Sequence, residues 1–218
     1  MNIHKSFAYD NNKTPLCELM HKYGSDKGQY ANYNCHNYTS FYHALFSRVR
    51  NQPLHIFELG LGTHHLDVPS NMGPNGNPGA SLRAWRDYFP NAQIYGADID
   101  TRILFQEERI QTFACDQTSP ESIAALWSTH FPTTSFDILI EDGLHTFEAN
   151  VCFFENSIHK LQDKGVYIIE DIHFDDIPKF EDKLQEWKCQ WPSLDIRLLK
   201  IPHYNKQDNN LLVAQKKV

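Results

Sequence analysis

Short apolar runs alternate along the chain with segments in which apolar residues recur every three or four positions. The first run, 55–60, ends in glycine, which is typical of a buried parallel strand that leads into a turn. Similar runs predict strands at 93–98, 110–115, 136–140, 166–169, 196–199 and 211–214. Helical spacing predicts helices at 39–49, 81–89, 119–127, 146–164 and 177–187. We expect Ser81 to cap the second of these helices and Gly165 to end the fourth.

The regular alternation of strand and helix predicts an α/β, Rossmann-like fold. Its sheet is expected to be mostly parallel, with helices on both faces and a C-terminal antiparallel strand. Residues 1–50 are polar and rich in Tyr, Asn and His, and we interpret them as a helical cap or lid on a domain formed by 51–218. The Gly/Pro/Asn-rich segment 64–80 is far longer than the ~2–6 residues usual between a strand and its helix, which favours a functional loop.

Composition narrows the classes of partner. The 218 residues are 41% hydrophobic, which is enough for one sizeable core. A net charge of −7 and the absence of a Lys/Arg run argue against nucleic acid. The five cysteines form no CxxC pair, and no segment has the length and apolarity of a membrane span or signal peptide. We therefore expect a cytoplasmic protein with reduced thiols and no membrane partner.

Acidic residues stand where the predicted strands end. They are Glu58, Asp98, Asp116, Asp142 and Asp171. Ligands of open α/β sheets bind at the carboxyl ends of the strands. For any single acid at such a place, a role as a turn residue or helix cap is a sufficient explanation. Five of them together favour a binding site.

The first strand end carries a glycine turn, Glu58-x-Gly60-x-Gly62. The third glycine of the full dinucleotide fingerprint is absent, because His65 stands there, so the turn is a weak signature of NAD. Asp98 ends the second strand, where a carboxylate can accept both hydroxyls of a ribose. These features suit an adenosine-containing ligand of either kind.

A divalent cation is predicted at the ends of two consecutive strands. Asp142 follows one of them, and Glu170 and Asp171 follow the next. If the strands are neighbours, ~4.8 Å apart, these carboxylates converge and repel each other unless a cation or protons neutralise them. Oxygen ligands suit Mg²⁺ best, with Mn²⁺ as the alternative.

His145 lies three residues after Asp142 and is expected to face the same cleft. A lone histidine in this place is more often structural than catalytic. An alcohol that attacks an electrophile must nevertheless lose its proton, and imidazole has a pKa suited to accept it near neutrality. His145 is therefore our candidate general base.

Three segments resemble the nucleoside-binding motifs of class I S-adenosylmethionine (SAM)-dependent methyltransferases. They are Phe57-Glu-Leu-Gly-Leu-Gly62, Tyr95-Gly-Ala-Asp98 and Cys115-Asp-Gln117. The resemblance implies SAM as the cofactor and 51–218 as its binding domain. It also implies that the glycine turn lies by the methionine part, Asp98 by the ribose, and Asp116 and Gln117 by the adenine.

A closer resemblance covers most of the chain. Its motifs are Lys22-Tyr-Gly-Ser-Asp-Lys-Gly28 with His36-x-Tyr38, the helix from Gly79 to Pro90 that contains Ser81, Asp116-Gln-Thr-Ser119, Glu141-Asp-Gly-x-His145 and Ile169-Glu-Asp171. Together they resemble the metal-dependent O-methyltransferases of macrolide deoxysugars, a group similar to proteins called cephalosporin hydroxylases.

This closer resemblance implies methylation of a sugar hydroxyl. The implied metal ligands are Asp142, Glu170 and Asp171, and the implied general base is His145, with Asp142 also catalytic. Ser81 and Glu141 join the implied SAM-binding residues. The acceptor itself is not encoded in any recognisable motif: an antibiotic, a surface polysaccharide and a nucleotide-linked sugar all fit, and self-association stays open.

Other interpretations compete with this one. An oxidoreductase or iron hydroxylase would use Asp142, His145 and His173 as a mixed ligand set. In a non-catalytic nucleotide-binding module, the carboxylates would only cap helices. Asp26, Lys27, His36 and Tyr38 either close over SAM or substrate, or cap an ordinary helical segment. His64, His65 and Asp67 lie in a Gly/Pro-rich loop and make a poor metal cage.

Overall fold

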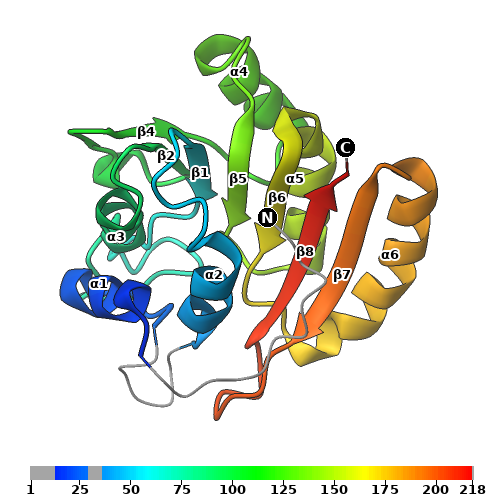
Figure 1. The fold of residues 1–218 in the computed structure, drawn as a ribbon, viewed down its shortest axis with the longest axis horizontal. Helices are drawn as coiled ribbons and strands as arrows, with labels where there is room; N and C mark the ends of the chain where they lie inside the picture. Colours follow the sequence, from blue (N-terminus) through cyan, green and yellow to red (C-terminus); the bar gives the residue numbers. More distant parts are fainter. Residues whose placement is uncertain (1–12, 29–35, 218) are drawn as a thin grey trace.

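The computed structural model describes residues 13–28 and 36–217. Its centre is an eight-stranded sheet in the order β3-β4-β2-β1-β5-β6-β8-β7 (Figure 1). The strands are β1 (His55–Leu59), β2 (Gln93–Asp98), β3 (Gln106–Glu107), β4 (Ile110–Ala114), β5 (Phe136–Glu141), β6 (Leu161–Ile169), β7 (Leu194–Lys200) and β8 (Asn210–Lys216). The five central strands, β4 to β6 in that order, pair in parallel, and β8 is antiparallel to both β6 and β7. The predicted fold class is confirmed.

Helices cover both faces of the sheet. They are α1 (Pro15–Tyr23), α2 (Tyr38–Phe46), α3 (Ala80–Tyr88), α4 (Pro120–His130), α5 (Phe147–Ser157) and α6 (Ile177–Gln190), with short 3-10 turns η1 (Thr101–Ile103), η2 (Ile158–Lys160) and η3 (Phe174–Asp176). Successive strand residues point to opposite faces. Thus Ile56 packs in the core beneath α1, α2 and α3, whereas Phe57 packs in the core beneath α4, α5 and α6. The near-continuous apolar strands of the sequence reflect this two-sided burial.

One predicted helix is too long. The helix expected at 146–164 ends at Ser157, and residues from Leu161 onward form β6. Leu161 pairs with Phe136 on β5, and the register between the two strands shifts after this pair. The strand β6 therefore begins at Leu161, and Gly165 lies within β6. Ile158 and Leu161 matched the helical spacing because both pack into the same core as α5. The prediction of Gly165 as a helix stop is therefore wrong.

The predicted cap of α3 is also wrong. The helix begins at Ala80, and its N-cap is Gly79 with a φ of 75°. Ser81 lies inside the first turn, and its hydroxyl donates to the carboxylate of Glu58 instead of to a backbone group. A residue that looks like a cap from sequence thus joins the helix to the end of β1.

The N-terminal segment supplies two helices that pack against the rest of the fold. The helix α1 starts at the N-cap Thr14, whose side chain accepts from the backbone N of Cys17 at 3.2 Å, and ends at Gly24 with a φ of 83°. The helix α2 is shorter than predicted at its C-terminal end and buries Tyr38 and Tyr42 completely. Residues 1–12 and 29–35 of the predicted cap lie outside the described residues. The boundary at residue 50 stays a prediction.

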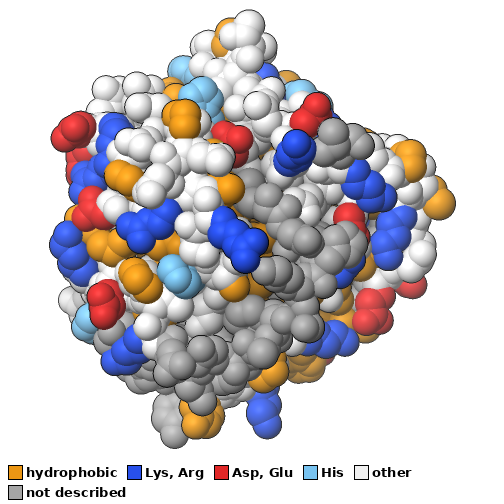
Figure 2. Space-filling model, viewed as in Figure 1, with side chains coloured by type: hydrophobic (Ala, Val, Ile, Leu, Met, Phe, Trp, Pro, Cys, Tyr) orange, Lys and Arg blue, Asp and Glu red, His pale blue; other side chains and the backbone are white. Residues whose placement is uncertain are grey.

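Surface features bear on the predicted partners. Among the described residues, no helix has the length and apolarity needed to cross a membrane. On the face shown in Figure 2, the Lys and Arg side chains are spread between acidic, apolar and polar ones and form no continuous strip among the coloured residues. The exclusion of nucleic acid stays a prediction.

Candidate active site

A cleft opens at the carboxyl ends of the central strands. It contains about 930 Å³ of empty space, its open mouth included. The predicted site residues that line it are Gly60, Gly62, Asp98, Asp116, Gln117, Asp142, His145 and Asp171. The other four predicted residues, Glu58, Ser81, Glu141 and Glu170, do not line it. Ser81 borders a smaller neighbouring cavity.

The glycine turn after β1 forms one wall of the cleft. Gly60 has a φ of 91°, and its backbone N donates to the carbonyl oxygen of Ala97 at 2.8 Å. A Cβ atom at this position would overlap the carbonyl oxygen of Asp142, so only glycine lets β1 and the end of β5 approach this closely. Gly60 and Gly62 both line the cleft.

Asp98 stands at the end of β2, next to the glycine turn. Its Oδ2 accepts from the backbone N of Leu61 at 2.7 Å and its Oδ1 from the backbone N of Asp100 at 2.8 Å. Burial raises the pKa of Asp98, and these backbone donors oppose the rise. Beside it the exposed side chain of Ile99 also lines the cleft. A carboxylate fixed beside an apolar side chain suits a ribose next to a flat base.

Asp116 and Gln117 follow β4, which lies on the other side of β2 from β1. The Oδ1 of Asp116 accepts from the backbone N and the hydroxyl of Thr118, at 2.9 and 2.7 Å. Gln117 is buried: its Oε1 accepts from the backbone N of Leu144 at 2.7 Å and its Nε2 donates to Glu141 at 3.0 Å. Gln117 thus braces the turn after β5, which the sequence did not reveal.

Glu58 and Glu141, which we call the core-facing acids, lie behind the cleft wall. Both are fully buried. Glu58 accepts from the hydroxyl of Ser81 and from Nε1 of Trp85, and Glu141 accepts from Gln117 and, at 2.5 Å, from Nδ2 of Asn150. Burial raises the pKa of Glu141 to about 6. The structure places these acids as internal braces, and their predicted contact with SAM stays a prediction.

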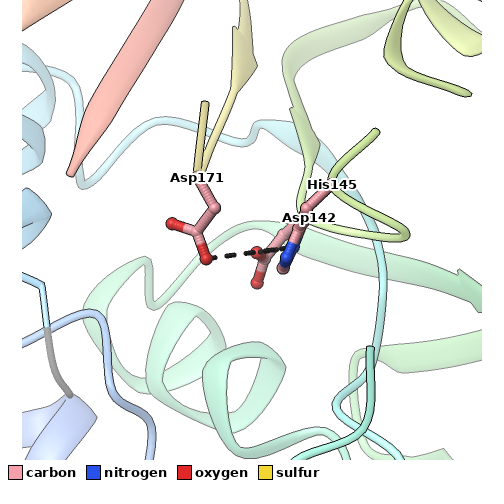
Figure 3. Close-up of side chains that lie close together, drawn as sticks. All are labelled: Asp142, His145 and Asp171. Carbon is pink, nitrogen blue, oxygen red and sulfur yellow. Dashed lines mark hydrogen bonds and ion pairs between the residues drawn. The ribbon is translucent and has the colours of Figure 1, made fainter. Parts of the chain in front are cut away.

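Asp142, His145 and Asp171 form what we call the cleft-facing cluster (Figure 3). The strands β5 and β6 are parallel neighbours, and the backbone N of Glu170 donates to the carbonyl oxygen of Glu141 at 2.9 Å. Nε2 of His145 lies 3.1 Å from Oδ1 of Asp142 and 3.8 Å from Oδ2 of Asp171. Each residue offers one ligand atom, and these atoms lie within 4.8 Å of one another.

Strained backbone accompanies the cluster. His145 and Asp171 have φ values of 59° and 55°, in the left-handed region that residues other than glycine rarely adopt. Ser70, from the long loop, also has a positive φ of 58°, and its Oγ lies 3.3 Å from Nδ1 of His145. Such strain persists where the surrounding structure fixes a functional geometry.

The charges of the cluster are coupled. Burial lowers the pKa of His145, but the hydrogen bond to Asp142 and the charges of Asp171 and Asp142 outweigh it and raise that pKa to about 10. Burial raises the pKa of Asp142, but Lys27 and His145 outweigh it and hold that pKa below its usual range. At neutral pH the imidazolium is therefore one counter-ion of the carboxylates.

Glu170 turns away from the cluster. Its carboxylate is 1% exposed and accepts from the hydroxyl of Tyr42 and from Nζ of Lys27. The same Nζ also donates to Oδ2 of Asp142. The predicted ligand set of Asp142, Glu170 and Asp171 is thus held together in part by a lysine. Tyr42 was missed, because an aromatic residue in an amphipathic helix is ordinarily part of the core.

Asp171 is held from the N-terminal segment. Its Oδ1 accepts from the hydroxyl of Tyr38 at 2.7 Å and lies 3.5 Å from Nδ1 of His36. The ring of His36 stacks on that of Tyr38, with centroids 4.7 Å apart, and Asp26 lines the cleft. The N-terminal motif residues therefore adjoin the predicted metal site, while Oδ2 of Asp171 faces the cluster.

The competing metal sets are not assembled. Nδ1 of His65 lies 2.8 Å from Oδ2 of Asp100, and Asp67 pairs with Arg102 at 3.1 Å, so these residues tie the loop to the end of β2. His173 pairs with Asp175 at 3.6 Å. Within residues 13–28 and 36–217, the group that could hold a metal contains Asp142, His145 and Asp171 and excludes His173.

Comparison with solved structures defines the class of fold. The chain is similar to the methyltransferase MycE of the mycinamycin biosynthetic pathway in complex with Mg and S-adenosylhomocysteine (SAH), with a TM-score of 0.70 and 26% identity over 94% of this chain and 55% of that one. Human methyltransferase-like protein 13 in complex with SAH has the same fold, with a TM-score of 0.54 and 18% identity over 76% of this chain and 72% of that one. The fold is that of the Rossmann-like methyltransferases.

The chain is also similar to curated sugar O-methyltransferases. The 8-demethyl-8-alpha-L-rhamnosyl tetracenomycin-C 2'-O-methyltransferase of Streptomyces olivaceus is 31% identical over 175 residues, 80% of this chain and 42% of that protein. The mycinamicin VI 2''-O-methyltransferase of Micromonospora griseorubida is 30% identical over 184 residues, 84% of this chain and 42% of that protein. No family model matches the chain. The resemblance to the macrolide sugar O-methyltransferases is confirmed, and the oxidoreductase alternative is not favoured.

The chain spans less than half the length of these curated relatives. What those proteins act on is therefore a guide to this chain and not a property of it.

Proposed function

We propose that the chain is a SAM-dependent O-methyltransferase that transfers a methyl group to a hydroxyl of a sugar or glycoside, assisted by a divalent cation. The observation that carries the proposal is the meeting of Asp142, His145 and Asp171 at one wall of a cleft that is also bordered by the glycine turn and Asp98. The names of the curated relatives, all O-methyltransferases of glycosylated natural products or their sugars, support the acceptor class.

In this proposal, SAM lies across the glycine turn. Asp98 accepts the ribose hydroxyls, Ile99 covers one face of the adenine, and the residues after β4 border its edge. Gly60 and Gly62 both line the cleft and carry no side chain, which lets the methionine part lie against the turn. The sulfonium methyl then points toward the cleft-facing cluster.

The donors at the cluster suit a hard cation. Oδ1 of Asp142 and Oδ2 of Asp171 face the same point, and oxygen ligands favour Mg²⁺ or Mn²⁺. We propose Asp142 and Asp171 as ligands and Glu170 as the third, after its carboxylate leaves Lys27. When bound, the cation lowers the pKa of the acceptor hydroxyl and orients its oxygen.

His145 is the proposed base. A divalent cation held by Asp142 and Asp171 would oppose protonation of the imidazole, so that the neutral ring would be available as the base. Nε2 accepts the hydroxyl proton as the acceptor oxygen attacks the methyl carbon. The new C–O bond forms while the C–S bond breaks, and its electron pair stays on sulfur, which gives neutral SAH. Ser70 at Nδ1 keeps the ring oriented.

Two measurements test this function. The purified chain should bind SAH in calorimetry. It should also transfer the labelled methyl group of SAM to some member of a panel of small glycosides with free hydroxyls, starting with methyl α-L-rhamnoside, and EDTA should stop the transfer until Mg²⁺ is restored. No affinity for SAH would reject the methyltransferase, and transfer that survives EDTA would reject the cation.

A further inference from the structure

Lys27 is a buried lysine, which is unusual in a folded protein. It follows the end of α1 in the described part of the N-terminal segment, and only 2% of it is exposed. Lys and Glu are almost never fully buried unless they are paired. Lys27 therefore has a role that its three carboxylate neighbours must define.

Those neighbours come from three adjacent strand ends. Nζ of Lys27 donates to Asp142 after β5 and to Glu170 after β6, and it lies 3.8 Å from Oε1 of Glu58 in β1. The ammonium of Lys27 is thus a monovalent cation paired with three carboxylates inside the acidic site.

Two cationic positions therefore lie side by side in this site. Lys27 takes the position between Asp142 and Glu170, and the cleft-facing cluster borders the other. Asp142 belongs to both: its Oδ2 contacts Lys27 and its Oδ1 contacts His145. A divalent cation that binds Glu170 must displace Lys27 from one of the Glu170 oxygen atoms. A divalent cation that binds only Asp142 and Asp171 is still repelled by the charge of Lys27 on the other oxygen of Asp142.

We propose that Lys27 is an internal counter-ion that sets how tightly the site binds its divalent metal. The inference rests on the proposed metal-assisted function and adds to it a residue that competes with the metal. It explains how several buried carboxylates lie together, because the Lys27 charge offsets part of their mutual repulsion. It also predicts that removal of the Lys27 charge leaves more uncompensated negative charge for the metal, and so tightens metal binding.

A purely structural role predicts a different result. If Lys27 only ties the N-terminal segment to the sheet, its loss lowers the melting temperature and leaves metal affinity unchanged or weaker, because the carboxylates lose their alignment. If Lys27 competes with the metal, affinity rises even where stability falls. Metal binding and thermal unfolding therefore separate the two roles without any measurement of activity.

The test is a Mn²⁺ titration at pH 8, in which electron paramagnetic resonance reports free Mn²⁺. It uses the wild-type chain and the variants Lys27→Met and Lys27→Gln. The glutamine keeps a hydrogen-bond donor but carries no charge. The matched control is Lys22→Met, because Lys22 lies in the same segment, is exposed and pairs with Asp87 at 3.0 Å. We expect both Lys27 variants to bind Mn²⁺ at least about tenfold more tightly than the wild type does. The Lys22 variant should bind Mn²⁺ as tightly as the wild type.

Unchanged or weaker binding by Lys27 variants that still unfold cooperatively would overturn the inference. The proposed metal site would still be supported if the wild type binds Mn²⁺ and Asp171→Asn abolishes that binding. The metal site and the counter-ion role of Lys27 can therefore fail separately. If neither the wild type nor any variant binds Mn²⁺, both are rejected.

If the Lys27 variants do not fold, amine acetylation of the wild type, read by mass spectrometry, takes their place. Labelling of Lys27 should be slow without metal and faster at saturating Mn²⁺, with Lys22 as the internal reference. A Lys27 rate that metal leaves unchanged would overturn the inference.

Discussion

Glu141 and Asp142 are consecutive residues with opposite fates. Glu141 points into the interior, where two neutral amide groups satisfy its oxygens, and no cationic side chain of the described residues contacts it. Asp142 points toward the cleft, between the charged groups of Lys27 and His145. Glu58, the other core-facing acid, is intermediate: neutral groups donate to it, and Nζ of Lys27 lies 3.8 Å from its Oε1. An acid at a strand end is thus a brace or a reactive group according to the face on which the pleat and the turn place it.

The contrast has an electrostatic basis. A buried carboxylate with only neutral donors resists ionisation, and burial raises the pKa of Glu141 to about 6. A carboxylate among cations ionises readily, and Lys27 and His145 hold the pKa of Asp142 low despite its burial. Only the second kind stands ready to bind a metal. The predictions below test this division, from the largest expected effect to the smallest.

Loss of the base should have the largest effect. His145→Ala should lower kcat for methyl transfer by about 10²- to 10⁴-fold, the usual contribution of a positioned general base. SAH affinity, measured by calorimetry, should stay near that of the wild type, because His145 is proposed to face the acceptor. A variant that keeps most of its kcat would show that the cluster only has a structural role.

Loss of the ribose acceptor should weaken SAM binding. Asp98→Asn keeps the size of the side chain but removes the charge and one of the two oxygens that accept from the backbone N of Leu61 and of Asp100. Hydrogen bonds to charged groups contribute about 1.5–3 kcal/mol, so SAH should bind roughly 10- to 100-fold more weakly in calorimetry. Equal affinity in a variant with the wild-type melting temperature would move the nucleoside elsewhere in the cleft.

Glu141→Gln should change stability in a pH-dependent way. Since burial raises the pKa of Glu141 from 4.5 to about 6, the folded state keeps a proton that the unfolded state releases between those values. The stability contributed by this group is therefore full below pH 4.5 and falls by about 2 kcal/mol as the pH rises through 6. Glutamine does not ionise, so the free energy of unfolding of the variant should rise by that amount relative to wild type across the window. Urea unfolding curves whose difference is constant from pH 4 to 7 would contradict the assignment of Glu141 as a core-facing acid.

The smallest effect is expected at Ser70. Its hydroxyl makes one exposed contact with His145 at 3.3 Å, and a net hydrogen bond of this kind is worth about 0.5–1.5 kcal/mol. Ser70→Ala should lower kcat about two- to tenfold and leave SAH affinity unchanged. A change confined to SAH affinity would place Ser70 on the cofactor side of the cleft.

Strong periodic signals made the fold predictable. The apolar runs that became β1, β2, β4, β5 and β8 are short and bounded by turn residues or acids, and the alternation of strand and helix left few topologies. The signal failed at the α5 to β6 connection, where apolar residues at helical spacing serve a strand. It also gave no warning of β3, a two-residue pairing at the sheet edge.

The site was predictable only in part. Order along the chain brings Asp142, His145 and Asp171 to one edge, because β5 and β6 are parallel neighbours. Sequence does not tell whether an acid at a strand end faces the cleft or the core, so Glu58 and Glu141 were grouped with the ligand-binding residues. Lys27 and Tyr42 reach Glu170 across more than a hundred residues of chain, and no periodicity encodes such a contact.

A crystal structure grown with SAH and Mn²⁺ tests the central claim most directly. The account predicts an anomalous peak within coordination distance of Asp142 and Asp171, with SAH across the glycine turn and its sulfur facing His145. A peak at some other place in the chain, or SAH bound with the cluster bare of metal at saturating Mn²⁺, would contradict it.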